Sequence, residues 1–385
     1  MNEITLLGLG TVGSGVARAC AGPGARWTVR RALVRDVGRA RDVVLPSGTL
    51  TASADEALAG AGPVIEVLGG EEPAASLIAA ALERGRPVAT ANKVAIAARG
   101  PRLFALARRH GVGLGIEACV GGGVPVIAAL HQLAGGQRLT AVTGVVNGTT
   151  NAILGAMERG QSYAEALAAA QAAGFAEPDP SADVEGHDTA AKLAILAALA
   201  FGVYVDPAAI PRRPLADAGM ADLRWAAARG ARVKYIAAAT LGADGALTLS
   251  VGPTAVPAAD ALAAPEGPGN AIRITGDLIG ATTLSGPGAG AAPTAGALLG
   301  DLAALAAGAL PLDYPEPDAP PAAVREPLAT YAVRLPARAD PDAIGHAARW
   351  SRDGDNLVGF IEGATASALA PAVRAAGGTL VRWAV

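Results

Sequence analysis

The chain has 385 residues, which is more than one hydrophobic core usually organises, so two or three compact units are expected. Apolar residues make up 51% and exclude an intrinsically disordered protein, although the chain contains 50 Gly and 27 Pro. The formal net charge of −3 argues against a general nucleic-acid binder. The two cysteines, Cys20 and Cys119, match neither a disulfide framework nor a zinc-ligand spacing.

No targeting segment is evident in the sequence. The first ten residues contain an acid and no basic stretch, which does not fit a secretory signal. The longest uninterrupted apolar run, residues 193–205, is too short to cross a bilayer. A cytoplasmic protein is therefore expected.

The N-terminal third alternates between predicted strands and helices. Strands are expected at residues 4–7, 27–34, 64–68, 87–89 and 112–116. Strands separated by helices of 10–15 residues form parallel sheets with right-handed crossovers. The pattern predicts an α/β fold with a Rossmann-type doubly wound parallel sheet over residues 1–123.

The middle of the chain has a different pattern. Helices are expected at residues 124–133, 151–159, 162–173 and 183–201, and strands at 139–146, 233–241, 246–251 and 271–275. This mixture predicts a second, α+β domain over residues 124–292. Its role as a substrate and dimerisation domain is implied only by the family resemblance of the segments quoted below. An Ala- and Leu-rich helix at 293–310 is expected to return to the first domain.

The C-terminal part begins with a proline-rich stretch. Five prolines in residues 311–321 predict a stiff, extended linker, placed at residues 311–329. Residues 330–385 then alternate between predicted strands (331–335, 357–361, 379–383) and helices (342–349, 366–376). A small appended βαβαβ unit is expected.

The first chemical motif is Gly8-x-Gly10-x-x-Gly13, which follows a predicted strand and opens a helix. Glycines at this spacing allow a tight turn and bring the backbone close to a pyrophosphate at a helix N-terminus. The motif alone is weak evidence, and an ordinary glycine-rich turn is the alternative. The β–α units that follow it favour a dinucleotide site.

Charges after the second strand bear on cofactor choice. An acid at this place binds the ribose 2′-hydroxyl of NAD, whereas Arg accommodates the 2′-phosphate of NADP. The chain has Arg35 followed by Asp36, with Arg39 and Arg41 close behind. This order favours NADP over NAD, and a solvated charged turn remains the alternative.

Asp188 and Lys192 lie four residues apart and so share one face of a predicted helix. Most such pairs are surface ion pairs of little consequence. Lys192, however, leads into the apolar run 193–205, so the pair is expected at the edge of a core. A partly buried lysine beside carboxylates is suited to proton transfer to a carbonyl oxygen.

Three polar or glycine-rich loops remain, beginning at Thr90, Glu117 and Asn147. Lys93 follows a predicted strand and is expected at the ligand-binding edge of the sheet. A thiol nucleophile at Cys119 is one interpretation, but a small buried cysteine is the commoner state and is expected here.

Seven segments together resemble homoserine dehydrogenase. They follow the family's order over residues 4–310, and the segment with Glu177, Asp188 and Lys192 is the most specific. The segments are GLGTVGSGV, VLGG, TANK, EACVGGGVPVI, VVNGTTNAIL, AQAAGFAEPDPSADVEGHDTAAKLAIL and GPGAGAAPTAGALLGDL. The chain is identified as a member of this family.

The resemblance implies reversible reduction of L-aspartate 4-semialdehyde to L-homoserine by NADPH or NADH, in threonine and methionine biosynthesis, by a homodimer. It implies that Lys192 donates the proton, with Asp188 beside it and Lys93 as a second active-site lysine. Substrate-binding residues would be Glu177, Asp183 and Asp188. Cofactor-binding residues would be Gly8, Gly10, Thr11, Val12, Gly13, Arg35, Gly69, Lys93, Gly174 and Gly290.

The resemblance also implies a site for a monovalent cation, Na⁺ or K⁺. Its ligands would be the Glu117 carboxylate and the backbone carbonyls of Val120, Gly122 and Val124. A glycine-rich loop with one acid fits a hard cation only weakly, so an ordinary loop stays open as the alternative.

The C-terminal unit departs from the family's pattern. Regulatory tails in the family usually have an ACT-type βαββαβ order, so a unit with three strands would be a partial ACT-like unit. With an altered sheet edge and a proline-rich spacer before it, weak or absent sensitivity to threonine is expected.

Two other functions remain open. A paralogue of this fold could act on another 4-oxo or 4-hydroxy amino acid. A regulatory protein could bind the nucleotide without turnover, although a sensor would not need the Asp188 and Lys192 pair.

Overall fold

The computed structural model describes residues 2–309, 312–344 and 349–384, and these form two compact units. The first unit comprises residues 1–138, 194–206 and 286–322. The second comprises residues 139–193, 207–285 and 323–385. Within the described ranges, no helix combines the length and apolar character needed to span a membrane.

The first unit contains a six-stranded sheet in the order β3-β2-β1-β4-β5-β6, in which every pair is parallel. Its strands are β1 (Asn2–Leu7), β2 (Trp27–Leu33), β3 (Leu50–Thr51), β4 (Val64–Glu66), β5 (Val88–Thr90) and β6 (Leu114–Gly115). The strand order reverses between β1 and β4, where sheets of this kind bind ligands beyond the carboxyl ends of the strands. The predicted doubly wound sheet is confirmed.

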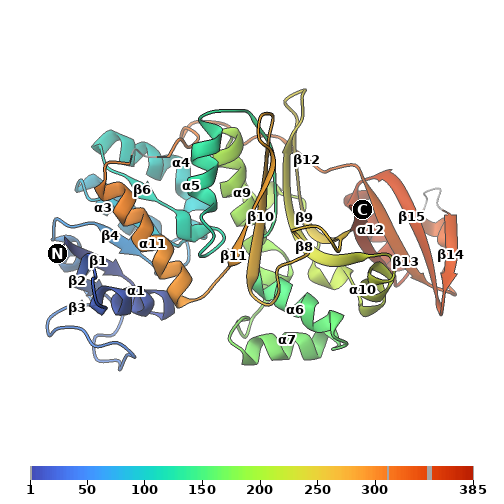
Figure 1. Ribbon diagram of the computed structural model, residues 1–385, viewed down its shortest axis with the longest axis horizontal. Helices are drawn as coiled ribbons and strands as arrows, with labels where there is room; N and C mark the ends of the chain where they lie inside the picture. Colours follow the sequence, from blue (N-terminus) through green and yellow to red (C-terminus); the bar gives the residue numbers. More distant parts are fainter. Residues whose placement is uncertain (1, 310–311, 345–348, 385) are drawn as a thin grey trace. The chain divides into compact units, whose positions relative to one another are not determined.

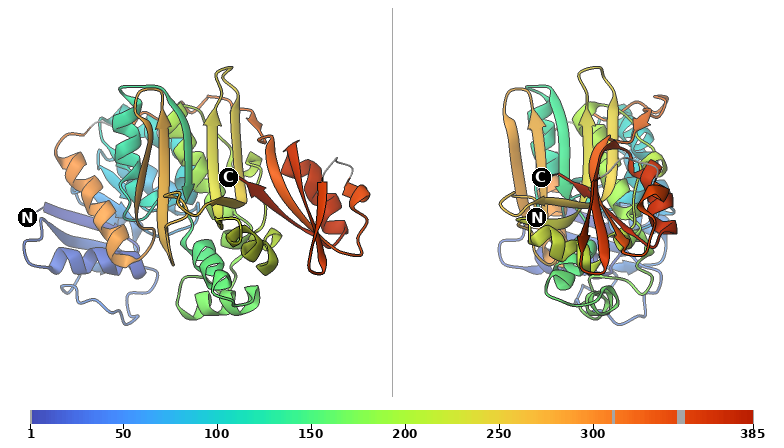
Figure 2. Two further views of the ribbon diagram at one scale, coloured as in Figure 1. Left: turned by 45° about the vertical axis from the view of Figure 1, so that its right-hand side comes forward. Right: turned by 90° about the vertical axis from the view of Figure 1, so that its right-hand side faces the viewer.

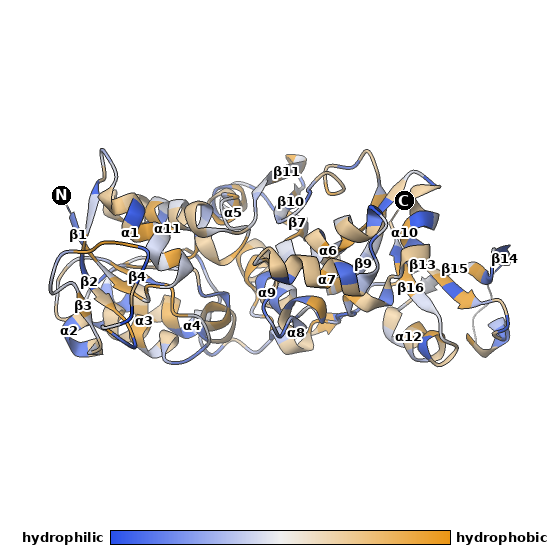
Figure 3. Cartoon of the chain, turned by 90° about the horizontal axis from the view of Figure 1, so that it is seen from below, coloured by the Kyte–Doolittle hydropathy of each residue, from blue (hydrophilic) through white to orange (hydrophobic). Residues whose placement is uncertain are grey.

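Helices cover this sheet. They are α1 (Thr11–Ala21), α2 (Ala54–Leu58), α3 (Ala74–Glu83), α4 (Lys93–His110) and α11 (Ala291–Ala306). The 3₁₀ turn η1 (Glu117–Cys119) and α5 (Val126–Ala134) follow β6 along the chain. Figure 1 shows α1 and α11 side by side, and a Cβ at Gly15 would lie 2.7 Å from the Ala291 carbonyl oxygen. Apolar residues of β1, β2 and α11, including Ile4 and Leu298, form the core between these layers (Figure 3). Gly15 therefore permits the close packing of α1 against α11.

The second unit is built on a ten-stranded sheet. The strands are β7 (Leu139–Val145), β8 (Ala231–Leu241), β9 (Leu247–Pro257), β10 (Gly269–Gly276), β11 (Gly280–Pro287), β12 (Val324–Arg325), β13 (Ala329–Pro336), β14 (Arg349–Asp353), β15 (Asn356–Ala364) and β16 (Thr379–Trp383). Their order is β11-β10-β7-β8-β9-β16-β13-β15-β14, with β12 parallel to β9. Strand β11 was not among the strands predicted from the sequence.

The remaining helices come from the middle and the end of the chain. They are α6 (Gly148–Glu158), α7 (Tyr163–Ala172), α8 (Ser181–Val184), α9 (His187–Phe201), α10 (Met220–Ala227) and α12 (Ala366–Ala375), with short 3₁₀ turns η2 (Pro207–Ala209), η3 (Leu215–Asp217) and η4 (Pro341–Ile344). The single helix predicted for residues 183–201 is wrong. The chain turns at Gly186, where φ is +83° and a Cβ would lie 2.4 Å from the Tyr235 hydroxyl. The break separates α8 from α9.

The C-terminal part has four strands, so the expectation of three is wrong. Their order is β16-β13-β15-β14, and α12 packs on one face of this sheet (Figure 2). The predicted helix 342–349 overlaps the turn η4 and the start of β14, and residues 345–348 lie outside the described part. The polar sequence of β14 has no apolar alternation, but Gly354 and Asp355 close a two-residue hairpin between β14 and β15. Whether this unit is ACT-like stays a prediction.

The proline-rich segment is not a free spacer, so the expectation of an extended linker before the C-terminal unit is corrected. Tyr314 is 4% exposed, and its ring stacks on that of Phe104 with centroids 4.5 Å apart. Glu316 forms an ion pair with Arg108 at 2.7 Å. Gly100 leaves room for the tyrosine, because a Cβ there would lie 2.7 Å from its ring. The segment is therefore packed onto the first unit.

Candidate active site

A cleft of about 1120 Å³ lies at the carboxyl ends of β1, β2 and β4 in the first unit. Five predicted cofactor residues line it: Gly8, Gly10, Thr11, Arg35 and Gly69. Gly8 has φ +106°, and a Cβ there would lie 2.8 Å from the Val67 carbonyl oxygen. The backbone can therefore adopt the tight turn that leads into the N-terminus of α1, where N–H groups favour an anion.

The other predicted cofactor residues are not among the residues that line this cleft. Gly13 packs on the turn itself, since a Cβ there would lie 2.3 Å from the Gly8 carbonyl oxygen. Val12 is in α1, Lys93 begins α4, and Gly290 precedes α11 with φ +118°. Gly174 belongs to the second unit. Their cofactor contacts stay predictions.

The charged turn after β2 forms one rim of the cleft. The Gly38 N–H donates to Asp36 Oδ1 at 2.8 Å, so this carboxylate is engaged within its own turn. The Arg41 guanidinium donates to the backbone oxygens of Asp36 and Arg39. Arg35 is exposed at the same rim. The rim therefore combines cations with an acid already hydrogen-bonded, a combination compatible with a phosphate.

A buried carboxylate, which the sequence analysis did not single out, joins the loops after β4 and β5. Glu66 is fully buried and accepts hydrogen bonds from Thr90 Oγ1, Leu68 N and Asn92 Nδ2. Burial raises the pKa of Glu66, and these donors oppose the rise. Asn92 caps α4 and donates to the Gly70 carbonyl oxygen, so Glu66 links the Gly69–Gly70 loop to the helix that begins at Lys93.

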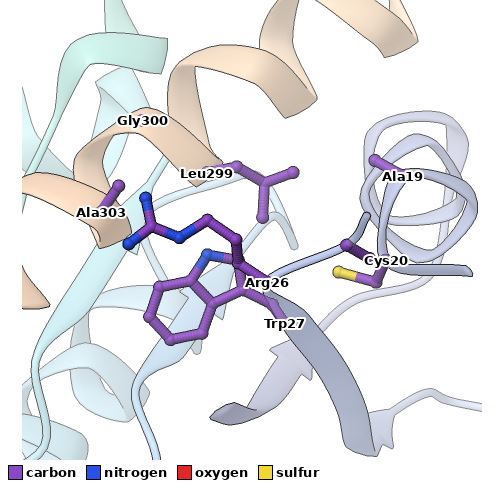
Figure 4. Close-up of a pocket in the computed structure, with 8 residues that line it drawn as sticks. Ala19, Cys20, Arg26, Trp27, Leu299, Gly300 and Ala303 are labelled. Carbon is purple, nitrogen blue, oxygen red and sulfur yellow. The ribbon is translucent and has the colours of Figure 1, made fainter. Parts of the chain in front are cut away.

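The two cysteines are unsuited to nucleophilic chemistry. Burial raises the pKa of the Cys119 thiol well above its ordinary value, and its Sγ donates to the Thr90 carbonyl oxygen at 3.3 Å. Cys20, whose pKa is raised to about 11, lines a hollow of about 260 Å³ between α1, the start of β2 and α11 (Figure 4). That hollow includes Trp27, the first residue of β2, and is therefore at the opposite edge of the sheet from the cleft.

In the second unit, Lys192 and Asp188 form the predicted pair on α9. Lys192 Nζ lies 2.6 Å from Asp188 Oδ2, and the two side chains are 13% and 8% exposed. Lys192 also donates to the Val146 carbonyl oxygen at 2.9 Å. The pair therefore sits at the edge of the core, where a carboxylate holds the ammonium in place.

Asp183 joins this group through Asn147. The Asn147 amide donates to Asp183 Oδ1 at 2.7 Å and to Asp188 Oδ2 at 2.9 Å. The loop that begins at Asn147 was singled out in the sequence, but no role was predicted for this residue. The feature that could have identified it is an asparagine between a strand and a helix, which is a common helix N-cap. We call these four residues the Lys192 group: Asn147, Asp183, Asp188 and Lys192.

Glu177 is the exception among the predicted substrate residues. Its side chain is exposed, and its backbone oxygen accepts a hydrogen bond from Gln171 Nε2 at 3.1 Å. The structure thus brings Asp183, Asp188 and Lys192 together but does not bring the Glu177 carboxylate into their hydrogen-bond network.

The loop predicted to bind a cation is organised around Glu117. Its carboxylate oxygens accept the backbone N–H groups of Ile127 and Ala128, 2.8 and 2.9 Å away, at the start of α5. Burial raises the pKa of Glu117. In the described ranges no three His, Cys, Asp or Glu side chains are grouped to hold a metal, so a cation would depend on backbone carbonyls. Carboxylate and carbonyl oxygens fit a hard cation.

Comparison with known proteins identifies the family. The family model described as homoserine dehydrogenase matches residues 125–303, and its NAD-binding domain matches residues 8–117. The chain is 40% identical to the homoserine dehydrogenase of Synechocystis over 78% of its length and 72% of the relative's, and 38% identical to that of Bacillus subtilis over 79% and 72%. The chain belongs to the homoserine dehydrogenase family.

Solved structures of homoserine dehydrogenases share the fold. The enzyme from Thiobacillus denitrificans superposes with a TM-score of 0.87 at 28% identity, over 99% of this chain and 98% of the other. A hyperthermophilic archaeal homoserine dehydrogenase in complex with NADPH has a TM-score of 0.65 at 26% identity, over 80% and 98%. The prediction of an NAD(P)-dependent oxidoreductase that interconverts L-aspartate 4-semialdehyde and L-homoserine is confirmed.

Proposed function

We propose that Lys192 is the proton donor in the reduction of L-aspartate 4-semialdehyde. The observation that supports this role is its position, part-buried with Nζ 2.6 Å from Asp188 Oδ2. The nicotinamide cofactor supplies the hydride. Negative charge then develops on the aldehyde oxygen, and the Lys192 ammonium stabilises that charge and transfers a proton to the oxygen. In the direction of homoserine oxidation the same amine accepts the hydroxyl proton.

The carboxylates near Lys192 suit an amino-acid substrate. With Asp183 and Asp188 ionised and Lys192 protonated, the Lys192 group carries one net negative charge. That excess complements an α-ammonium, which a carboxylate binds through charge-assisted hydrogen bonds. Glu177 would contribute a further carboxylate. We assign substrate binding to Glu177, Asp183 and Asp188.

For the cofactor, the proposal is NADP in preference to NAD. Arg35 stands at the rim of the cleft, while the neighbouring Asp36 carboxylate is occupied by the Gly38 N–H. Gly8, Gly10, Thr11, Val12, Gly13 and Gly69 would hold the pyrophosphate and ribose, with Lys93, Gly174 and Gly290 as further contacts. The archaeal relative in complex with NADPH agrees with this choice.

A monovalent cation, Na⁺ or K⁺, would bind Glu117 and the carbonyls of Val120, Gly122 and Val124. Gly121 and Gly122 have φ of +78° and +58°, conformations that glycine adopts without strain and that turn a chain sharply around an ion. The cation's proposed role is to fix this loop, since the same carboxylate also caps α5.

We further propose a homodimer in the cytoplasm. In the second unit β11 ends the sheet, and most of its residues are exposed or part-exposed. An open strand edge of this kind is a ready surface for a second copy of the chain. Multi-angle light scattering of the purified chain would give the mass of a dimer.

Steady-state oxidation of L-homoserine, followed by NADPH or NADH absorbance, tests the function. Turnover of L-homoserine is the expected result. Turnover of a 4-hydroxy amino-acid analogue alone would indicate a paralogue. Cofactor binding without turnover of either compound would favour a regulatory protein.

A further inference from the structure

A single carboxamide bridges the two acids of the Lys192 group. Asn147 is 3% exposed, and its Nδ2 lies 2.7 Å from Asp183 Oδ1 and 2.9 Å from Asp188 Oδ2. The same Asp188 oxygen accepts Lys192 Nζ at 2.6 Å. Asp188 Oδ2 is thus fixed from two sides, by an ammonium and by an amide.

The orientation of the amide follows from its other end. Asn147 Oδ1 accepts the backbone N–H of Thr150 at 2.8 Å and so caps α6. A backbone N–H can only donate, so the atom facing it must be the oxygen. The two amide hydrogens therefore point toward Asp183 and Asp188.

This arrangement also connects the two helices on either side of Gly186. Asp183 is in α8 and Asp188 is in α9, on either side of a glycine with φ +83°. Two carboxylates held this close repel each other, which costs free energy. Two amide hydrogens, one directed at each acid, reduce this cost without adding a charge.

We propose that Asn147 is a positioning residue for catalysis. It holds Asp183 and Asp188 together and thereby keeps Lys192 aligned for proton transfer. The inference rests on the proposed role of Lys192. It assigns Asn147 no contact with the reacting atoms.

The variant Asn147→Asp tests this role. Aspartate caps a helix as well as asparagine does, so the bond to Thr150 N is kept while both donors are lost and a third carboxylate is added. We expect kcat for L-homoserine oxidation to fall about 10- to 100-fold, the range for lost hydrogen bonds to charged groups. The Kd for NADPH should stay near the wild-type value. The Tm is expected to fall, because a third carboxylate is placed beside two others at a buried position, so kcat is measured well below the unfolding transition.

Asn147→Ser separates the lost donors from the added charge, because serine also caps helices but brings no carboxylate. Its kcat should lie between those of Asn147→Asp and the wild type. Ser162→Asn exchanges one capping residue for another at the start of α7 and serves as the control, with unchanged kcat. A kcat of Asn147→Asp within threefold of wild type would overturn the proposal. Losses of kcat in both variants that are fully explained by a fall in Tm would also overturn it.

A structural readout keeps the test independent of turnover. If the wild type oxidises no 4-hydroxy amino acid, the proposed function fails, and crystal structures of the wild type and Asn147→Asp then decide the inference. The expected difference is a wider separation of the Asp183 and Asp188 carboxylates and loss of the Lys192 bond to Val146 O. Unchanged positions of these side chains would overturn it.

Discussion

Two lysines of the second unit have amines inside the protein, but their surroundings differ. Lys192 Nζ has a carboxylate partner 2.6 Å away. Lys234 is 1% exposed and donates to Asn151 Oδ1 and Pro265 O, both uncharged acceptors. Burial lowers the pKa of Lys234 to about 8. The ion pair makes Lys192 the better candidate for holding and releasing a proton at a fixed atom.

Replacing Lys192 with Ala should remove most of kcat. General acid catalysis contributes about 10²- to 10⁴-fold, and kcat for L-homoserine oxidation should fall within that range. The cofactor Kd, measured by nucleotide fluorescence, should change little. A kcat within threefold of wild type would move the proton-donor role to Lys93.

Arg35→Ala should weaken NADPH more than NADH. A guanidinium that meets the 2′-phosphate makes charge-assisted hydrogen bonds, and their loss should raise the Kd for NADPH about tenfold. Arg30→Ala is the control, because Arg30 lies on β2, the strand that precedes Arg35, in an exposed pair with Glu3. Equal losses for both nucleotides would show that Arg35 is only a surface charge.

At the scale of elements, Lys234 joins a strand, a helix and a loop. It projects from β8 to Asn151 of α6 and to Pro265, while Asn151 Nδ2 donates to the carbonyl oxygens of Pro265 and Gly267. These contacts satisfy buried polar groups that would otherwise lack partners. The polar cluster therefore locks α6, which begins beside Asn147, onto the sheet.

The lowered pKa of Lys234 predicts a pH-dependent stability. Between about pH 8 and 10.5 the unfolded chain keeps the proton that the folded chain releases, so the free energy of unfolding rises with pH. Below about pH 8 both states hold the proton, and this contribution is constant. Over that window the wild type should gain up to about 3 kcal/mol relative to Lys234→Met.

Urea unfolding of both proteins at pH 7.5 and pH 10, about two and a half units apart, measures this gain. The variant loses two hydrogen bonds at every pH, so only the change of the difference with pH is informative. A difference that stays constant would mean that Lys234 titrates normally.

At the scale of the chain, the C-terminal part continues the sheet of the second unit. β16 pairs with β9 in parallel, and the buried Arg213 donates to the carbonyl oxygens of Leu380 and Pro253. Arg334 forms an ion pair with Asp222 at 3.0 Å, with side chains 6% and 9% exposed. The tail is thus integrated into the fold. The weak response to threonine was expected from a sheet of three strands and from a proline-rich spacer, and the structure shows neither.

Truncation after Pro327 should destabilise the enzyme. It removes the partner of the buried Asp222, and breaking a buried ion pair costs about 3–5 kcal/mol. We expect a Tm lower by about 5 °C or more, or aggregation at the exposed β9 edge. Asp222→Asn, which keeps the whole chain, should give a smaller fall in the same direction.

An unchanged Tm after truncation would show that the second unit does not depend on the tail for its stability. Threonine titration accordingly belongs on the full chain, where loss of inhibition and loss of stability remain separate measurements.

The Rossmann-type sheet, the family and most of the Lys192 group could be predicted from local sequence patterns. Parallel strands buried on both faces produce short apolar runs, and the glycine spacing after β1 reflects a turn that a side chain would block. Asp188 and Lys192 were predictable as a pair because helical spacing alone places them on one face. These signals are local and need no knowledge of distant contacts.

The remaining features of the site and the tail arise from contacts between residues far apart in the chain. The bridge from Asn147 to Asp183 and Asp188 joins residues 36 and 41 positions apart, a pairing that no local pattern encodes. The close approach of the Tyr235 hydroxyl to Gly186, where a Cβ would lie 2.4 Å from it, joins residues far apart in the chain. Strand β14 lacks an apolar alternation because its side chains are mostly exposed, and backbone pairing with β15 defines it. Contacts between distant residues, which follow from packing, completed the site and the tail.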